Sequence, residues 1–568
     1  MAAKLHGEQL QGFLGVNLRR DRLSLADSDC ARAINADFHT QPGTARIRPG
    51  ITSVRTGIPG AVTLVTRQNS QQYLMADGRW YRNGTDLGVI LTPGNGSTVG
   101  FRPVDDPQSW TFLANITGMY KDRGVLRQWG TAAPNTPPAL FGGSAGVLLG
   151  NYSLRYTYLR KDGTAVAYES NPSEVSNTLG VTNTTILVTN LVDSADAQIT
   201  HKRLYRTVNT GSTWLNEADI AQGTTTATLT LADDELGETL EEDNDPPPLA
   251  GIAIEFEGHI FLAGDVVNPH YVWYSKRFRP ESFPAANFIE IGYPGDPIRS
   301  LVRLVGLLGV ITRDTKYRVV GNDASGFVAI EALSSRGTPA GHAALVTDQG
   351  ALFVASDGLF LTNFQSADVG LTGEIESLFY RQTVNDFLPI DWSRASEMAL
   401  AAYKQRYYFS YPTTDGRTLM AVYSRETQKW YFYDLAVQCL FADEVSDTLW
   451  GGTDWGEVIG IDSYTSSTED IRMQLTFADR GGPALNVRKR YLYMTIDADA
   501  GNGAIPCNLV VDGNPRYSFT IRGRRKRTLV RLPDRMLGYT WRLTVDTLSR
   551  EAQAIYGVAM MGIPLQVA

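Results

Sequence analysis

Residues 349–361 read QGALFVASDGLFL, two short alternating apolar segments on either side of an Asp-Gly turn. Period-two alternation around Asp-Gly is the sequence signal of a β-hairpin. Related patterns occur at residues 254–262, 401–434 and 448–461. Because copies spaced by roughly 40–50 residues are typical of propeller blades, this region predicts a β-propeller in which each hairpin-rich sheet is one blade.

The composition also favours strands over helices. The chain has 568 residues, with 54 Gly, 26 Pro, 26 Tyr and 10 Trp. A chain of this length predicts two to four domains. Abundant turn formers and aromatic residues suit many short strands, and few stretches show the apolar spacing of a helix. We therefore expect an all-β protein.

The charge balance argues against a protein that surrounds nucleic acid with basic residues. The formal net charge is −8 and the isoelectric point is near 5.5. Binding to nucleic acid normally leaves a strongly basic footprint. A mildly acidic wall would nevertheless let DNA slide past, because it does not attract the phosphates.

The cysteines and the hydropathy indicate the compartment in which the protein is expected. Cys30, Cys439 and Cys507 are far apart and odd in number, which predicts a reducing compartment without a disulfide framework or a cysteine metal site. The sequence contains no run of about 18 apolar residues, so we expect no membrane span. The first 11 residues are polar and lack the apolar core of a signal peptide.

Proline-rich stretches divide the chain. Residues 132–138 and 246–248 are proline-rich and flank a region of short alternating strands. We therefore predict a propeller interrupted by an inserted fibronectin III-like β-sandwich, with a second β-sandwich at the C-terminus. The predicted parts are an N-terminal arm (1–60), first propeller blades (61–140), the inserted sandwich (141–248), remaining blades (249–465) and the C-terminal sandwich (466–568).

Several patterns imitate enzyme motifs without the context that they need. Residues 142–146 match Gly-x-Ser-x-Gly, but they follow a proline-rich linker and precede a strand, so they predict a flexible hinge rather than a nucleophile elbow. Residues 347–350 and 355–358 resemble the Asp-box turns of sialidase propellers, which are structural. The six histidines are dispersed and form no zinc motif. The sequence predicts no enzyme and no cofactor or metal.

Two charged runs have more than one interpretation. The acidic run at 233–245 lacks the regular loop of a calcium site and is interpreted as a solvated linker. The basic run Arg522, Arg524, Arg525, Lys526 and Arg527 lies between two predicted strands, so we expect a hairpin tip. An exposed tip without a partner, docking to an acidic neighbour, and contact with DNA phosphates all remain open.

Two short segments carry a resemblance to a known family. The arm residues 35–38 and 43–50, ending in Arg-Pro-Gly, resemble the N-terminal segment of phage tail proteins. Residues 450–462 and 475–477 are similar to the last blade and C-terminal entry of the packaged-DNA stabilisation proteins, which form the tail hub or nozzle of short-tailed bacteriophages. The fibronectin-like insertion departs from that pattern.

The resemblance implies a structural virion protein. Its subunits would form a hexameric ring below the portal and adaptor, in contact with tail fibre or needle proteins. Genomic DNA would pass through the lumen without sequence specificity. The ring would retain packaged DNA and conduct its ejection, after assembly in the host cytoplasm. The family supplies no catalytic residues.

An alternative is a carbohydrate-binding or glycan-cleaving tail propeller for recognition of a host receptor. Aromatic residues such as Trp430, Tyr431 and Tyr433 could stack on sugars. Their alternation fits packing inside a blade better. Binding of saccharides at the propeller face would distinguish this alternative from the nozzle.

Overall fold

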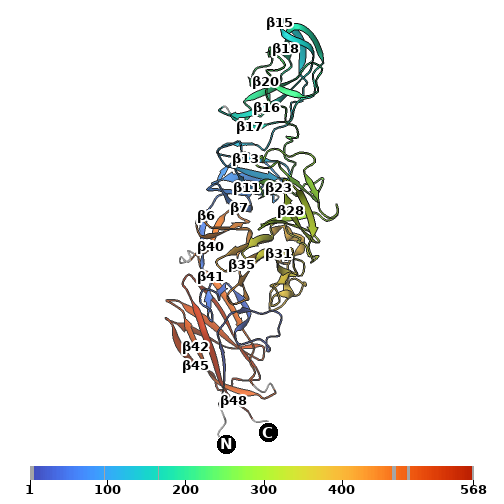
Figure 1. Cartoon of the computed structure of the whole chain (residues 1–568). Coiled ribbons are helices and arrows are strands. Elements are labelled where there is room, and N and C mark those ends of the chain that lie inside the picture. Colours follow the sequence, from blue (N-terminus) through green and yellow to red (C-terminus); the bar gives the residue numbers. More distant parts are fainter. Residues whose placement is uncertain (1–4, 95, 164, 464–468, 483–485, 566–568) are drawn as a thin grey trace.

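The chain folds into a row of three β-rich parts (Figure 1). The computed structural model describes residues 5–94, 96–163, 165–463, 469–482 and 486–565. The inserted sandwich lies at one end, the propeller in the middle, and a sandwich that contains the first and last described strands at the other end. Within the described residues, no helix is long and apolar enough to cross a membrane.

Seven blades form the propeller, which confirms the predicted all-β class. Each blade is a four-stranded antiparallel set, and the innermost strands of successive blades contact one another in a closed circle. Blade 1 contains β7 (Val62–Gln68), β8 (Gln71–Ala76), β9 (Arg79–Arg82) and β10 (Thr85–Asp86). Blade 2 contains β11 (Gly96–Phe101), β12 (Trp110–Asn115), β13 (Tyr120–Asp122) and β14 (Leu126–Gln128). Blade 3 contains β22 (Ile252–Phe256), β23 (His259–Ala263), β24 (Tyr271–Tyr274) and β25 (Phe288–Glu290).

Blades 4–7 follow in chain order. They contain β26 (Ile298–Leu304), β27 (Leu307–Thr312), β28 (Lys316–Asn322) and β29 (Gly326–Glu331); β30 (Ala344–Thr347), β31 (Gly350–Ala355), β32 (Gly358–Thr362) and β33 (Val369–Gly370); β34 (Ala399–Tyr403), β35 (Arg406–Pro412), β36 (Thr418–Ser424) and β37 (Lys429–Tyr433); and β38 (Val437–Asp443), β39 (Thr448–Thr453) and β40 (Val458–Ser463). Two short 3₁₀ helices, η1 (Glu376–Leu378) and η2 (Trp392–Glu397), lie between blades 5 and 6.

The tight turns explain why the blade pattern is visible in the sequence. Asp77 and Gly78 both have positive φ, at 47° and 70°, between β8 and β9. Two successive positive values match the two-residue turn that follows the twist of antiparallel strands. The Asp-box-like turns at 347–350 and 355–358 likewise connect β30 to β31 and β31 to β32.

An inserted β-sandwich separates blades 2 and 3. Its sheets are β15-β18-β21 and β17-β16-β19-β20, the two-layer architecture that fibronectin type III domains share. The strands are β15 (Ala139–Tyr152), β16 (Leu154–Asp162), β17 (Ala165–Glu169), β18 (Leu179–Thr189), β19 (His201–Thr207), β20 (Trp214–Ala221) and β21 (Ala227–Leu229). The glycine-rich residues 142–146 lie inside β15, whose pairing with β18 is bulged there, so they are not the hinge that the sequence predicts.

The first 60 residues differ from the predicted extended arm, because they belong to three different sheets. Strand β6 (Gly50–Arg55) pairs with β40 and completes blade 7. Strands β2 (Gly15–Val16) and β3 (Asp29–Ile34) join the sheet of blade 6, and β1 (His6–Gln11), β4 (Ala36–Asp37) and β5 (Ala45–Ile47) join the C-terminal sandwich. Apart from the local pairs β2–β3 and β4–β5, their partners lie hundreds of residues away, so local patterns do not reveal the pairing.

The C-terminal sandwich shares a sheet with the propeller. Ten strands run in the order β34-β35-β36-β37-β2-β3-β41-β47-β43-β44, and the second sheet contains β4-β5-β48-β42-β45 together with β1 and β46. The C-terminal strands are β41 (Ile471–Phe477), β42 (Lys489–Asp499), β43 (Ala504–Val511), β44 (Asn514–Arg522), β45 (Lys526–Arg531), β46 (Leu537–Gly538), β47 (Trp541–Ser549) and β48 (Ala554–Pro564). The predicted boundary at 465/466 lies outside the described residues.

A continuous apolar core accompanies this shared sheet. Phe409 of blade 6 and Met494 of the sandwich belong to the same buried cluster. The rings of Phe13 and Phe477 meet inside it, with centroids 4.7 Å apart. The N-terminal segment therefore joins the two parts through side chains as well as through backbone pairing.

We expect Phe477→Ala to lower the free energy of unfolding by about 3–5 kcal/mol, because it leaves a cavity in this core. Chemical denaturation of the full chain measures the change. Phe141→Ala is the matched control: Phe141 is 53% exposed, so the same substitution should change stability by no more than about 0.5 kcal/mol. Equal effects of the two substitutions would contradict a core shared between propeller and sandwich.

Candidate functional site

The predicted basic run does not form a hairpin tip. Arg522 ends β44, which pairs with β43 in the ten-stranded sheet, whereas Lys526 begins β45, which pairs with β42 in the other sheet. The run is therefore a crossover between the two sheets of the C-terminal sandwich. Arg525 lies 3.7 Å above the ring of Tyr556 and 3.4 Å from a carboxylate oxygen of Asp497.

The aromatic residues considered for sugar stacking are buried inside blade 6. Trp430 is 1% exposed, and Tyr431 and Tyr433 are fully buried. They pack in the core shared with the sandwich. No sugar can stack on these rings without disruption of that core, so any saccharide site must lie elsewhere.

A small cavity lies at the axis of the propeller. It measures about 540 Å³ and is lined by the first strands of blades 1–5, from Gln68 on β7 to Leu345 on β30. Its lining includes apolar residues such as Ile254 and charged ones such as Glu255 and Arg303. A cavity of this size suits a small molecule. A double helix does not fit through it.

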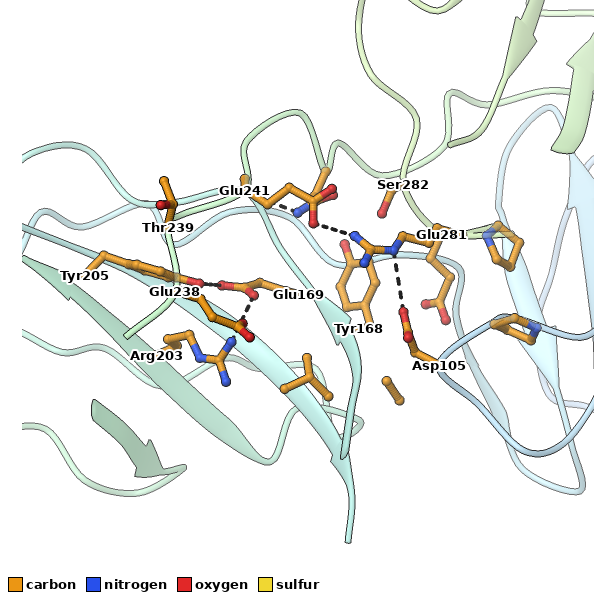
Figure 2. A pocket seen from close by; sticks show the side chains of 16 residues that line it. Asp105, Tyr168, Glu169, Arg203, Tyr205, Glu238, Thr239, Glu241, Glu281 and Ser282 are labelled. Carbon is orange, nitrogen blue, oxygen red and sulfur yellow. Dashed lines mark hydrogen bonds and ion pairs between the residues drawn. The ribbon is translucent and has the colours of Figure 1, made fainter. Parts of the chain in front are cut away.

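A second cavity, of about 380 Å³, lies where the inserted sandwich meets the propeller (Figure 2). Its wall combines residues of β17 and β19, the acidic run, and the loop between β24 and β25. Glu169, Arg203, Tyr205, Glu241 and Arg279 supply most of its charged and aromatic groups. We call it the junction cavity.

The environment shifts the pKa values of two of the carboxyl groups that line this cavity, Glu169 and Glu241, in opposite directions. Burial raises the pKa of Glu169, against hydrogen bonds of 2.7 Å each from the Thr157 and Tyr205 hydroxyls. Burial alone would also raise the pKa of Glu241, but Lys276 and Arg279 outweigh it and the pKa is lowered. Opposed shifts of this kind occur in acid–base sites and in structural ion networks alike.

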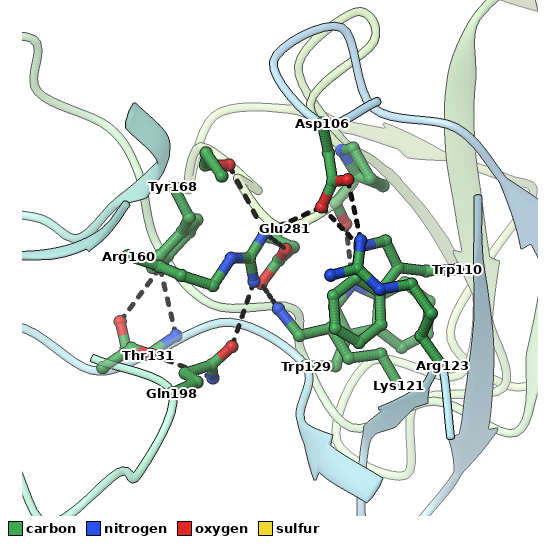
Figure 3. A network of polar contacts seen from close by, with 12 residues as sticks. Asp106, Trp110, Lys121, Arg123, Trp129, Thr131, Arg160, Tyr168, Gln198 and Glu281 are labelled. Carbon is green, nitrogen blue, oxygen red and sulfur yellow. Dashed lines mark hydrogen bonds and ion pairs between the residues drawn. The ribbon is translucent and has the colours of Figure 1, made fainter. Parts of the chain in front are cut away.

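A buried ionic network lies beneath the junction cavity (Figure 3). Glu281, from the β24–β25 loop of blade 3, binds Lys121 of blade 2 and lies 2.9 Å from the Arg160 guanidinium of the insertion. All three side chains are at least nine-tenths buried. Burial lowers the pKa of Lys121 to about 8, although Glu281 opposes that shift. The network therefore joins the insertion to two blades.

Asp106 extends the network. It accepts hydrogen bonds from the Trp110 indole at 2.7 Å and from Arg123 at 2.8 Å, and Arg160 lies 3.8 Å away. Both arginines and Lys121 lie over the Trp110 ring, with Arg123 closest at 4.3 Å. The aromatic face and the carboxylates thus compensate the two buried cations, Lys121 and Arg160, and the more exposed Arg123.

The functional groups that line the junction cavity are carboxylates, guanidinium groups, hydroxyls and an amide. The residues described around the junction cavity include neither histidine nor cysteine, and nowhere in the described ranges do three metal-ligating side chains cluster. Glu241 of the acidic run, predicted as part of a solvated linker, instead forms ion pairs with Lys276 and Arg279. Several of the charges around the cavity are paired with one another, Arg203 with Glu169 and Arg279 with Asp105 and Glu241, which suits a structural joint.

Comparisons with known proteins add no function. No family model matches the chain, and no curated protein sequence matches it. Solved structures that match include virginiamycin B lyase from Staphylococcus aureus, which is 11% identical with a TM-score of 0.26, the match covering 54% of this chain and 98% of that one.

Two further structures match at similar levels. YCF48 bound to D1 peptide is 8% identical with a TM-score of 0.27, over 72% of this chain and 95% of that one. PorZ, a surface component of the type-IX secretion system of Porphyromonas gingivalis, is 9% identical with a TM-score of 0.27. The match covers 82% of this chain and 46% of that one. Likeness at this level carries no functional argument.

We expect Glu281→Ala to destabilise the protein by about 3–5 kcal/mol, because Lys121 and Arg160 would keep buried charges without their shared carboxylate. Chemical denaturation measures the loss, and limited proteolysis at the proline-rich linkers reports loosening of the insertion.

Glu242→Ala is the control. Glu242 pairs with Arg155 at 2.8 Å, but its side chain is 54% exposed, so the loss should not exceed about 1 kcal/mol. If Glu281→Ala were as mild, the network would not be the element that joins the insertion to the blades.

Proposed function

We propose that the protein is a structural subunit of a bacteriophage tail, forming a ring-shaped nozzle or hub below the portal and adaptor. The observation that carries the proposal is the rigid row of three parts. A shared sheet joins the propeller to one sandwich, and a buried ionic network joins it to the other. A stiff elongated subunit is what the wall of a conduit requires.

The axial cavity supports a conduit formed between copies rather than within one. At about 540 Å³ it is too small for a double helix. A lumen for DNA must therefore be enclosed by several subunits, and closure of such a ring requires a heterologous interface. The net charge of −8 is compatible with a wall that does not retain the phosphates.

We expect purified particles of the phage to contain this chain, and the purified protein or its complex with the adaptor to form rings with a central opening. Mass spectrometry of virions and electron microscopy with mass determination test both points. Phage that lacks the gene should package DNA and then lose it. A strictly monomeric protein absent from virions would overturn the proposal.

Saccharide binding at the junction cavity is a second candidate function. The observation in its favour is the pair Glu169 and Glu241, whose pKa values are shifted in opposite directions beside two tyrosines and two arginines. Carboxylates and guanidinium groups are the usual partners of sugar hydroxyls, and a cavity of about 380 Å³ admits a small saccharide.

For this candidate we expect binding on a glycan array that Arg203→Ala weakens at least about tenfold, since Arg203 lines the cavity. Arg303→Ala, in the separate axial cavity, is the control. An array without hits for the intact chain would remove saccharide binding and leave the nozzle proposal untouched.

A further inference from the structure

Two open sheet edges lie side by side on the C-terminal sandwich. Strand β44 is the last strand of the ten-stranded sheet, and β45 is the last strand on one side of the second sheet. Residues 523–525 connect them, so both edges face the same side of the sandwich. No described strand pairs with the outer side of either. Their outward backbone N–H and C=O groups are therefore available to an added strand.

This double edge is basic, although the chain as a whole is acidic. Residues 466–568 contain 15 Lys and Arg but nine Asp and Glu, whereas the net charge of the chain is −8. Arg516, Arg522, Arg527 and Arg531 are exposed and form no ion pair with any described residue. Arg525 differs, because Tyr556 and Asp497 anchor it. The strands thus present positive charge that the protein itself does not neutralise.

The side chains of β45 follow a pattern that suits a polypeptide better than phosphate. Arg527, Leu529 and Arg531 are exposed at alternate positions, so they project from one face of the strand. Leu529 is 57% exposed. An apolar side chain between two arginines offers nothing to a phosphate backbone, but it can pack against an apolar residue directly opposite on a neighbouring strand.

We infer that the β45 edge is a docking site for an extended acidic segment of a partner protein, which adds to the sheet as a further strand. The matching segment has an acidic, an apolar and an acidic residue at alternate positions, opposite Arg527, Leu529 and Arg531. Backbone hydrogen bonds provide affinity, and the alternate side chains provide specificity. The inference does not depend on the proposed tail function.

Two other roles fit basic residues at this place, and the experiment must separate them. Charged side chains on an edge strand often serve to prevent edge-to-edge aggregation. A basic surface can also bind DNA phosphates, with affinity that falls steeply with salt. Neither role requires backbone pairing or uses Leu529.

The experiment measures fluorescence anisotropy of a labelled peptide, Thr-Glu-Thr-Val-Thr-Glu-Thr, titrated with the full-length protein at low ionic strength. We expect saturable binding that Arg527→Glu/Arg531→Glu weakens at least about tenfold, the effect of losing two exposed ion pairs. The control Arg102→Glu/Arg381→Glu changes charge equally at exposed propeller positions and should bind normally. Leu529→Thr should weaken binding without any change in charge.

A peptide N-methylated at alternate backbone nitrogens separates strand addition from simple ionic contact, and it requires no protein variant. It keeps both carboxylates but cannot pair with β45, so we expect its binding to be lost. Equal binding of the methylated peptide would overturn the proposal in favour of a non-specific ionic contact. Tighter binding of duplex DNA that displaces the peptide would overturn it in favour of a phosphate surface. Absence of binding by either probe would leave the charges as protection of the edge.

Discussion

Backbone pairing between the N-terminal strands and partners several hundred residues away is the interaction on which this molecule depends. Val16 pairs with Trp430 in blade 6, and Cys30 pairs with Phe477 in the C-terminal sandwich. Without β2 and β3 the ten-stranded sheet would separate into two, one in each part. Without β6, blade 7 would keep its three inner strands and lose its outermost one.

The two junctions of the propeller use different physics. On the side of the C-terminal sandwich, hydrogen-bonded strands and a shared apolar core join the parts. On the side of the insertion, Lys121, Glu281 and Arg160 meet in a largely buried ionic network. A buried ion network adds little net stability, yet it strongly penalises any arrangement that separates its charges. The insertion is thereby held in one orientation.

The sequence was sufficient to predict the fold class, but it did not predict the pairing of strands that are distant from each other in the chain. Asp-Gly turns such as Asp77-Gly78 require a specific local backbone, so each hairpin is visible from its own residues. The pairing of β6 with β40 leaves no local sign, because a short strand such as GITSVR suits any sheet edge. For the same reason the alternating residues beside Arg522 predict two strands correctly but not that they lie in different sheets.

The candidate site shows the same limit. Lys121, Arg160 and Glu281 belong to three separate parts of the chain, and nothing in their immediate sequence marks them as partners. The glycine-rich residues 142–146 suggested a hinge because bulged and flexible segments share a composition, and only the pairing of β15 with β18 distinguishes them.

Completion of blade 7 by β6 has a consequence for how the protein is made. When the ribosome has completed residues 50–55, their partner β40, at residues 458–463, does not yet exist. At elongation rates of roughly 5–20 residues per second, the N-terminal strands wait on the order of tens of seconds for these partners. During that interval β2 and β3 can pair with each other but lack their partners β37 and β41, which leaves aggregation-prone edges in the nascent chain. The nascent chain is therefore exposed from the synthesis of these strands until β40 and β41 are made, and slow translation of the intervening stretch would lengthen the exposure.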